Sequence, residues 1–441
     1  MSASLFDSPL HAQLFSTGET GRLFSDSAAI RAMLLVEGAL AKVQGAQGVI
    51  PELSAAAIHR ASLEIQVDPG ALAGATGENG VCVPGLVAAF RSEMQAPEHA
   101  QFVHWGATSQ DIIDTALMLR LRQALVLAEN DLRAIITALA KGARAHAALP
   151  MPGRTYGQFA TPTSWGAVLS GWGEPLIDAL QALPDLRRHA LYVSLSGAAG
   201  TGSALGPRAA ETRRRLAEAL GLHDPQRSWH DDRSPVLRIA DWQGQVMATL
   251  GRMGQSLIGL TGSGIEEVSL GHAGASSTMP QKQNPVGPSV LVALAHHFSG
   301  SRASLQSAAM HQHQRDGAAW FAEWLALPSL SLSLAAALAH ARTLAEEIAP
   351  RPVQMHAALE SNLGLIHAEA LSFALSALMP RPEAQKATKM LCIEAQEKQV
   401  PLEKLARADY PALPAALFDA ATQMGQAPAM ARAFVTRASR L

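Results

Sequence analysis

The stretch that decides the fold is TSQDIIDTALMLRLRQALVLAENDLRAIITALA, at residues 108–140. Its apolar residues recur three and four positions apart and no proline interrupts them, which predicts one long helix. Thr108 or Ser109 can cap this helix, and Asp111 lies in its first turn, an arrangement like a capping box. The segment therefore predicts a fold built on long helices.

Three further long segments are rich in alanine, glycine and serine and poor in charge. A helix that is apolar or small on nearly every face must be buried on nearly every side. We therefore expect an all-α fold with a central bundle of long helices, packed closely and buried further in an oligomer. The segments are SWGAVLSGWGEPLIDALQAL (164–183), LRIADWQGQVMATLGRMGQSLIGLTGSGIEEV (237–268) and VGPSVLVALAHHFSGSRASLQSAAM (286–310).

Shorter elements and boundaries complete this outline. Residues 25–51 predict another helix, with Ser25 or Ser27 as its N-cap. Strand-like alternation is scarce, and HALYVSLSG (189–197) is the best short candidate. The chain breaks near residue 107 and again at IAPRPVQM (348–355). We expect an N-terminal helical domain at 1–107, the long-helix bundle at 108–348 and a C-terminal helical domain at 349–441.

Composition excludes several classes of function. The chain has 441 residues, 48% of them hydrophobic and 16% charged, with a formal net charge of −2, so it offers no long-range field for nucleic acid or an acidic membrane. Cys82 and Cys392 fit no metal or redox spacing, which favours a reducing cytosol. No signal peptide is visible, and the most apolar run (327–348) is broken by serines, His340 and Arg342. We expect a cytoplasmic protein without a nucleic-acid or membrane partner.

Three polar stretches interrupt the helical pattern, and each has an ordinary structural interpretation beside a functional one. In HWGATSQDIIDT (104–115), Thr108 and Ser109 begin a helix, where amides and hydroxyls either bind an anion or simply form an N-cap. In MPGRTYGQFATPTSWG (151–166), Arg154 can hold a carboxylate by a two-pronged contact, or the stretch is a loop with a surface arginine.

The third polar stretch is GASSTMPQKQNPVG, at residues 274–287. Pro280 and Pro285 forbid a helix through it, so it is a loop between helical patterns. Lys282 and Asn284 offer a cation and an amide to an anion. Taken by itself, the stretch is equally a flexible surface connection.

Together these stretches resemble the three signature regions of the fumarase/aspartase superfamily, in the same order along the chain. The third region there reads G-S-S-x-M-P-x-K-x-N-P, and ASSTMPQKQNP (275–285) matches every fixed position except Ala275. Within the superfamily, residues 14–400 are most similar to the bacterial 3-carboxy-cis,cis-muconate cycloisomerases. SGAAGTGSALG, SWHDDR and AAWFAEWLALPSL carry that likeness.

One substitution bears on the reaction. The lyases of the superfamily carry a histidine within G-R-T-H-x-Q, and Tyr156 stands there in this chain. The cycloisomerases also lack that histidine and carry another aromatic residue. Further departures concern substrate recognition: Gln283 replaces a usual arginine or lysine, Phe159 a common histidine, and Asp232 and Ser234 alter the W-H-x-Q-R-D pattern.

The resemblance implies an intramolecular conjugate addition in the protocatechuate branch of the β-ketoadipate pathway. A muconate carboxylate attacks an alkene carbon to close a lactone, and the neighbouring carbon takes a proton. This chemistry needs donors aimed at the developing charge and one proton donor, with no metal or organic cofactor. Ser276 is the expected proton donor, with His104 and Tyr156 as further catalytic candidates. Gly274 and Gly287 are plausible hinges of a loop that closes over the substrate.

The resemblance also implies the substrate-binding set and the assembly. The substrate is a small polycarboxylate, and the three regions come from different subunits of a homotetramer. Two alternatives remain: a lyase of the argininosuccinate or adenylosuccinate type that releases fumarate, and a non-catalytic structural protein on the same scaffold. The residues expected to bind substrate are Thr108, Ser109, Arg154, Gln158, Ser277, Lys282, Asn284 and Arg315.

Overall fold

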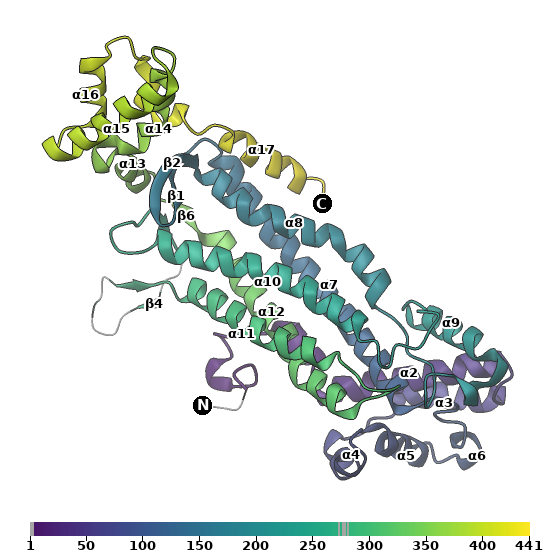
Figure 1. Ribbon diagram of the computed structural model, residues 1–441. Coiled ribbons are helices and arrows are strands. Elements are labelled where there is room, and N and C mark those ends of the chain that lie inside the picture. The colour runs from purple at the N-terminus through teal and green to yellow at the C-terminus, as the bar shows by residue number, and fades with distance from the viewer. Residues whose placement is uncertain (1–3, 272–273, 276–278, 280–281) are drawn as a thin grey trace. The chain divides into compact units, whose positions relative to one another are not determined.

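The computed structural model describes residues 4–271, 274–275, 279 and 282–441, and most of its elements are helices (Figure 1). The prediction of an all-α fold is confirmed. Long helices dominate the described chain, and the capped segment at residue 108 begins the longest of them. They are α7 (Ser109–Ala145), α8 (Trp165–Ala190), α10 (Ser234–Leu260), α11 (Val286–Ala308) and α12 (Gly317–Glu347).

The chain divides into two compact units, and the long helices contribute segments to both. Unit 1 comprises Met1–Asp131, Ala179–Ala248 and Ala293–Ala339. Unit 2 comprises Leu132–Asp178, Thr249–Val292 and His340–Leu441. The three-domain division at residues 107 and 348 stays a prediction.

Unit 1 combines bundle segments with short N-terminal helices. Ser25 caps α2 by accepting from the Ala28 amide at 3.2 Å, as the sequence predicts. Ala39 and Leu40 of α2 pack against Leu216 of α9. The shorter helices of this unit are η1 (Pro9–His11), α1 (Gly18–Leu23), α2 (Asp26–Ala46), α3 (Glu52–Glu64), η2 (Pro69–Leu72), α4 (Ala73–Asn79), α5 (Val83–Glu93), α6 (Pro97–Ala100), η3 (Ser203–Arg208) and α9 (Ala209–Leu220).

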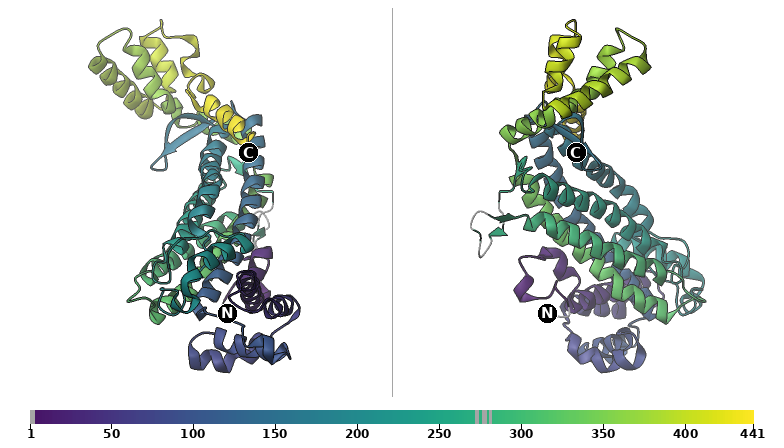
Figure 2. Two further views of the ribbon diagram at one scale, coloured as in Figure 1. Left: turned by 90° about the vertical axis from the view of Figure 1, so that its right-hand side faces the viewer. Right: turned by 60° about the vertical axis from the view of Figure 1, so that its left-hand side comes forward.

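Buried polar contacts join the bundle segments of unit 1, where the helices lie side by side (Figure 2). The Arg233 guanidinium at the start of α10 bonds to Asp114 of α7 at 2.7 Å and to Glu323 of α12 at 2.6 Å, and all three side chains are buried. Burial alone would lower the pKa of Arg233, but the two carboxylates outweigh it and raise that pKa. A buried charge needs such partners, so this triad fixes three helices to one another.

Unit 2 contains the other bundle segments, three small sheets and the C-terminal helices. Leu371, Leu391 and Leu402 form the core of the C-terminal helices. The sheets pair β1 with β2, β3 with β6 and β4 with β5, all antiparallel. Its strands and shorter helices are β1 (Pro150–Thr155), β2 (Gln158–Ser164), β3 (Val268–Ser269), β4 (Gly274–Ala275), β5 (Gln283–Asn284), β6 (Ala349–Pro350), α13 (Pro352–Glu360), η4 (Asn362–His367), α14 (Ala368–Leu375), α15 (Arg381–Lys398), α16 (Leu402–Asp409), η5 (Ala415–Phe418), η6 (Ala420–Thr422) and α17 (Ala427–Ala438).

The glycines of the long helices permit the close approach expected from the sequence. A Cβ atom at Gly254 of α10 would lie 2.6 Å from the Pro288 carbonyl oxygen of α11. A Cβ atom at Gly173 of α8 would lie 2.1 Å from the Phe434 ring of α17. Only glycine fits at such contacts without a shift of the neighbour.

The strands depart from the sequence-based expectation. The second polar stretch, interpreted as a loop, forms the β1–β2 hairpin. HALYVSLSG forms no regular strand: Tyr192 makes only an isolated bridge to His223. Gly287 lies in the first turn of α11 rather than in the loop before it. The prolines of the second stretch conceal its pairing, and the partner of Tyr192 lies 31 residues further along the chain, outside the window in which alternation is read.

Among the described residues, α12 has the length and composition of a membrane span. The most apolar window of α12 has a mean hydropathy of 1.5. More than half of that window, 56%, is buried inside the protein. This burial is typical of a core helix.

Candidate functional site

The turn that starts α7 contains the reciprocal contact of a capping box, made by an aspartate. The Thr108 amide donates to Asp111 Oδ2 at 3.0 Å. The contact fixes the backbone of the first polar stretch where the helix amides begin. Thr108 and Ser109 are each half-buried at this end, which suits an anion-binding helix terminus.

Asp111 also anchors a second loop against this turn. Its carboxylate accepts from the Ser196 amide at 2.8 Å and from the Gly197 amide at 2.9 Å. His230 Nε2 lies 2.8 Å from Asp111 Oδ1, and both side chains are buried. Because the carboxylate accepts only, His230 carries its proton on Nε2 in this pair. The network therefore fixes the Thr108 turn from two other segments of the chain.

His104 is paired with a buried glutamate from α2. His104 Nδ1 lies 2.6 Å from Glu37 Oε1, and the Glu37 side chain is 1% exposed. Burial alone would lower the pKa of His104, but the hydrogen bond and charge of Glu37 outweigh it and raise that pKa. The His104 backbone has a φ of 65°, in the left-handed region that a non-glycine residue rarely adopts. The loop thus holds a half-buried imidazole against a buried carboxylate, which favours the charged form of the imidazole.

Arg315 reaches the same end of α7 from the loop before α12. Its Nε donates to Gln110 Oε1 at 2.8 Å, and its Nη2 approaches Thr108 Oγ1 at 3.4 Å. Gln110 is buried and donates to the His230 carbonyl oxygen at 2.9 Å. Unit 1 therefore brings together four of the predicted site residues: His104, Thr108, Ser109 and Arg315.

The second polar stretch places Tyr156 at the tip of the β1–β2 hairpin. Thr155 pairs with Gln158, which leaves Tyr156 and Gly157 as a two-residue turn. Both have positive φ, 52° and 75°, as a type I′ hairpin turn requires. The Tyr156 side chain is fully exposed in the single chain, and Gln158 is exposed beside it.

Arg154 makes its two-pronged contact inside the protein. Its Nη1 donates to Glu267 Oε2 at 3.0 Å and its Nη2 pairs with Oε1. Glu267 is fully buried, and the Phe159 ring centroid lies 5.0 Å from the guanidinium carbon. Breaking such a pair would leave a buried carboxylate uncompensated. The guanidinium expected to hold substrate therefore holds the hairpin to the segment before β3.

The third polar stretch is described in part. β4 and β5 pair Gly274 with Asn284 and Ala275 with Gln283. Lys282 and Asn284 line a cavity of about 760 Å³ in unit 2, together with Arg351. Ser276 and Ser277 lie outside the described residues.

Sequence reasoning missed the residues that position the predicted ones. Glu37 orients His104, and Glu267 forms an ion pair with Arg154. Asp111 appeared only as a helix cap, although its carboxylate also holds the loop at Ser196. A lone acid within the apolar run MLLVEGAL was the available signal for Glu37, since a buried carboxylate needs a partner.

Comparisons with known proteins agree with this architecture. A family model described as "Lyase" matches residues 19–300. A Pseudomonas putida relative named 3-carboxy-cis,cis-muconate cycloisomerase is 36% identical, over 90% of this chain and 94% of the relative. A Dickeya dadantii relative named N-acetyl-S-(2-succino)cysteine lyase is 31% identical, over 87% of this chain and 85% of the relative.

A solved structure shares the whole fold. The 3-carboxy-cis,cis-muconate lactonizing enzyme from Pseudomonas putida superposes with a TM-score of 0.91 at 33% identity. The match covers 98% of this chain and 99% of that one. The resemblance drawn from the three polar stretches is thereby confirmed over nearly the full length.

Proposed function

The chain belongs to the lyase family, within the fumarase/aspartase superfamily, and we propose that it is a cycloisomerase that closes 3-carboxy-cis,cis-muconate to 4-carboxymuconolactone. The observation that carries this proposal is Tyr156, which stands at the hairpin tip where lyases of the superfamily have a histidine base. A lactonisation needs no base to remove a proton from carbon.

In the proposed reaction a carboxylate oxygen bonds to one alkene carbon, and the π electrons move to its neighbour. Ser276 Oγ then gives that carbon its proton and regains one from solvent. A serine hydroxyl is a weak acid, so Lys282 stabilises the alkoxide as it forms. His104, whose charged form Glu37 favours, positions a carboxylate, and Tyr156 lines the pocket or donates a hydrogen bond.

The remaining candidates bind the carboxylates of the substrate. Arg315 and Thr108 converge on one anion site at the start of α7, with Ser109 beside them. Ser277, Asn284 and Gln158 serve the other carboxylates. Arg154 acts in this scheme mainly through the hairpin that it fixes to Glu267.

We also propose that the protein is a cytoplasmic homotetramer that shares its sites between subunits. The candidate residues fall into two sets, one in unit 1 and one in unit 2. Tyr156 and Gln158 extend into solvent from the single chain, as expected of residues that complete a neighbour's site.

A lyase that releases fumarate is the second candidate, because the Dickeya dadantii relative carries the name of a succino-compound lyase. The test offers the purified protein 3-carboxymuconate, argininosuccinate, adenylosuccinate and N-acetyl-S-(2-succino)cysteine in parallel. Loss of diene absorbance reports lactonisation, and a coupled assay reports fumarate. We expect turnover of the muconate alone, abolished by Ser276→Ala with the oligomer intact. Fumarate release from any succinyl compound, without loss of the diene, would reject the cycloisomerase assignment.

A further inference from the structure

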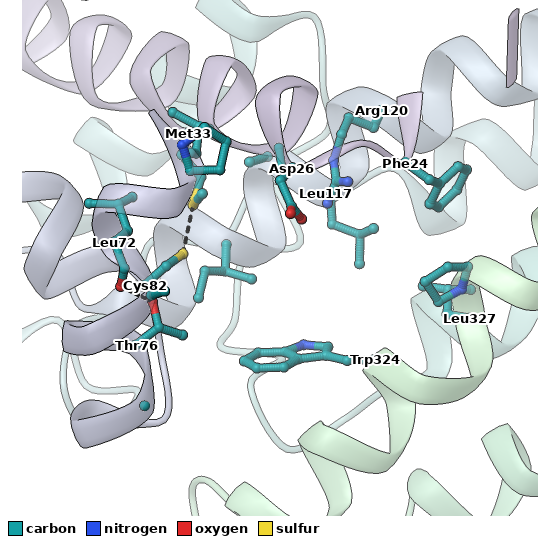
Figure 3. A pocket seen from close by; sticks show the side chains of 18 residues that line it. Phe24, Asp26, Met33, Leu72, Thr76, Cys82, Leu117, Arg120, Trp324 and Leu327 are labelled. Atoms are coloured by element: carbon teal, nitrogen blue, oxygen red, sulfur yellow. Dashed lines mark hydrogen bonds between the residues drawn. The ribbon is translucent and has the colours of Figure 1, made fainter. Parts of the chain in front are cut away.

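A cavity of about 670 Å³ lies in unit 1, between α2, α4, α7 and α12, and the proposed reaction does not use it (Figure 3). Its volume falls within the range of ligand pockets. Most of its wall is apolar, with Met33, Leu72, Leu117 and Trp324 among the lining side chains. Of the residues lining it, Arg120 alone is a cation.

Arg120 has no carboxylate partner among the described residues, and its guanidinium carbon lies 5.9 Å from the centroid of the Phe24 ring. Its Nε atom is inaccessible to solvent and makes no hydrogen bond, and its Nη1 reaches only the Leu23 carbonyl oxygen, at 3.3 Å. Asp26 stands exposed beside the cavity, and no ion pair joins it to Arg120 in the described chain. Burial lowers the pKa of Arg120, with Cys82 and Asp26 opposing that shift. Buried guanidinium groups in proteins are normally paired with an anion.

The cavity is separate from the predicted substrate site. Ile113, Leu117 and Arg120 lie on one face of α7, further along the helix than Ser109. At the helical rise of 1.5 Å per residue, Arg120 stands about 16 Å from Ser109 along the axis. An anion held by Arg120 is therefore distinct from one held at Thr108 and Ser109.

We propose that this cavity binds a small monocarboxylate with a flat apolar body, its carboxylate on Arg120 and its ring against Trp324. Figure 3 shows these two side chains on opposite sides of the cavity. A guanidinium matches a carboxylate with two parallel hydrogen bonds, and the apolar wall takes the ring. The exposed Asp26 carboxylate also lines the cavity and repels ligands that carry more than one negative charge.

The experiment measures binding of 2-naphthoate to the full chain by calorimetry, with neutral 2-naphthamide as the isosteric control. Loss of a charge-assisted hydrogen bond costs about tenfold or more in affinity. We expect naphthoate to bind at least about tenfold more tightly than naphthamide, and Arg120→Gln to remove that difference.

Two glycines of α4 supply a matched pair of variants. A Cβ atom added at Gly74 or at Gly77 would have no neighbouring atom within 4 Å. Gly77 lines the cavity, whereas Gly74 does not. Gly77→Phe should fill the cavity and abolish naphthoate binding, whereas Gly74→Phe should leave it unchanged. Both variants are first checked for native circular dichroism.

Cysteine labelling locates the bound ligand. Cys82 lines the cavity and Cys392 does not, and burial raises the pKa of both thiols. Naphthoate should slow alkylation of Cys82 at alkaline pH without slowing that of Cys392. Equal binding of naphthoate and naphthamide, or unchanged Cys82 labelling at saturating naphthoate, would overturn the proposal. So would a failure of naphthoate to bind, as expected if another subunit supplies the anion for Arg120.

Discussion

At the scale of single residues, the site depends on acids that never touch substrate in the proposed reaction. Glu37 is nearly inaccessible, and its Oε2 makes no hydrogen bond to the described residues. The Glu37 carboxylate faces His104 and raises its pKa. Asp111 also raises the pKa of His104, and Arg91 lowers it. Glu37 therefore acts as a positioning residue through the imidazole.

Glu37→Gln should move the titration of His104 to lower pH, because the neutral amide no longer favours the imidazolium. The midpoint is measured by NMR of the His104 ring. Glu52→Gln, an exposed acid at the start of α3, is the control and should leave the midpoint unchanged. An unmoved His104 midpoint in Glu37→Gln would contradict the pairing.

The same pair makes stability depend on pH. The folded pKa of His104 lies above its ordinary value of 6.5. The stability that the pair contributes is therefore fully present below about pH 6.5 and is lost as pH rises through the folded pKa. The difference in melting temperature between the wild type and Glu37→Gln should shrink as pH increases across that window.

At the scale of elements, the long helices were predictable and the hairpin was not. The spacing of apolar residues predicts a helix that ends near residue 140, and α7 ends at Ala145. The β1–β2 hairpin contains Pro150, Pro152 and Pro162, which weaken the sequence signal for strands. Its positive-φ turn at Tyr156 also lacks the usual Asn-Gly signature.

Positioning contacts were less predictable than the elements. Glu37 and its partner His104 are 67 residues apart in the sequence. Asp111 and His230 are 119 residues apart, and Glu267 and Arg154 are 113 residues apart. Local patterns carry no information about such distant pairs. The three polar stretches could be found because each breaks a helical pattern locally.

Close packing of α10 and α11 gives a matched test within one helix. Gly254→Ala would place a methyl group 2.6 Å from the Pro288 carbonyl oxygen, whereas a methyl at Gly259 meets nothing within 4 Å. We expect Gly254→Ala to lower the free energy of unfolding by about 1–2 kcal/mol, since overpacking exceeds the gain in helix propensity. Gly259→Ala should raise it by up to about 1 kcal/mol. Denaturant unfolding measures both, and a stabilising Gly254→Ala would contradict the close approach.

At the scale of the whole molecule, the proposed sharing of sites between subunits can be tested by mixing two inactive variants. His104→Ala removes a unit 1 residue and Lys282→Ala a unit 2 residue. If different subunits supply them, random mixing leaves about one site in four with both intact. Coexpression should therefore restore roughly a quarter of wild-type activity. Sites built within one chain would stay inactive in the mixture.

The central claim is an intramolecular addition completed by one proton delivered to carbon. The most direct measurement is the product formed from 3-carboxy-cis,cis-muconate in D₂O, analysed by NMR and mass spectrometry at early times. The account predicts a carboxylated lactone with a single deuterium on the carbon beside the ring-closing bond, and no fumarate. An unchanged muconate, or a product without carbon-bound deuterium, would contradict it.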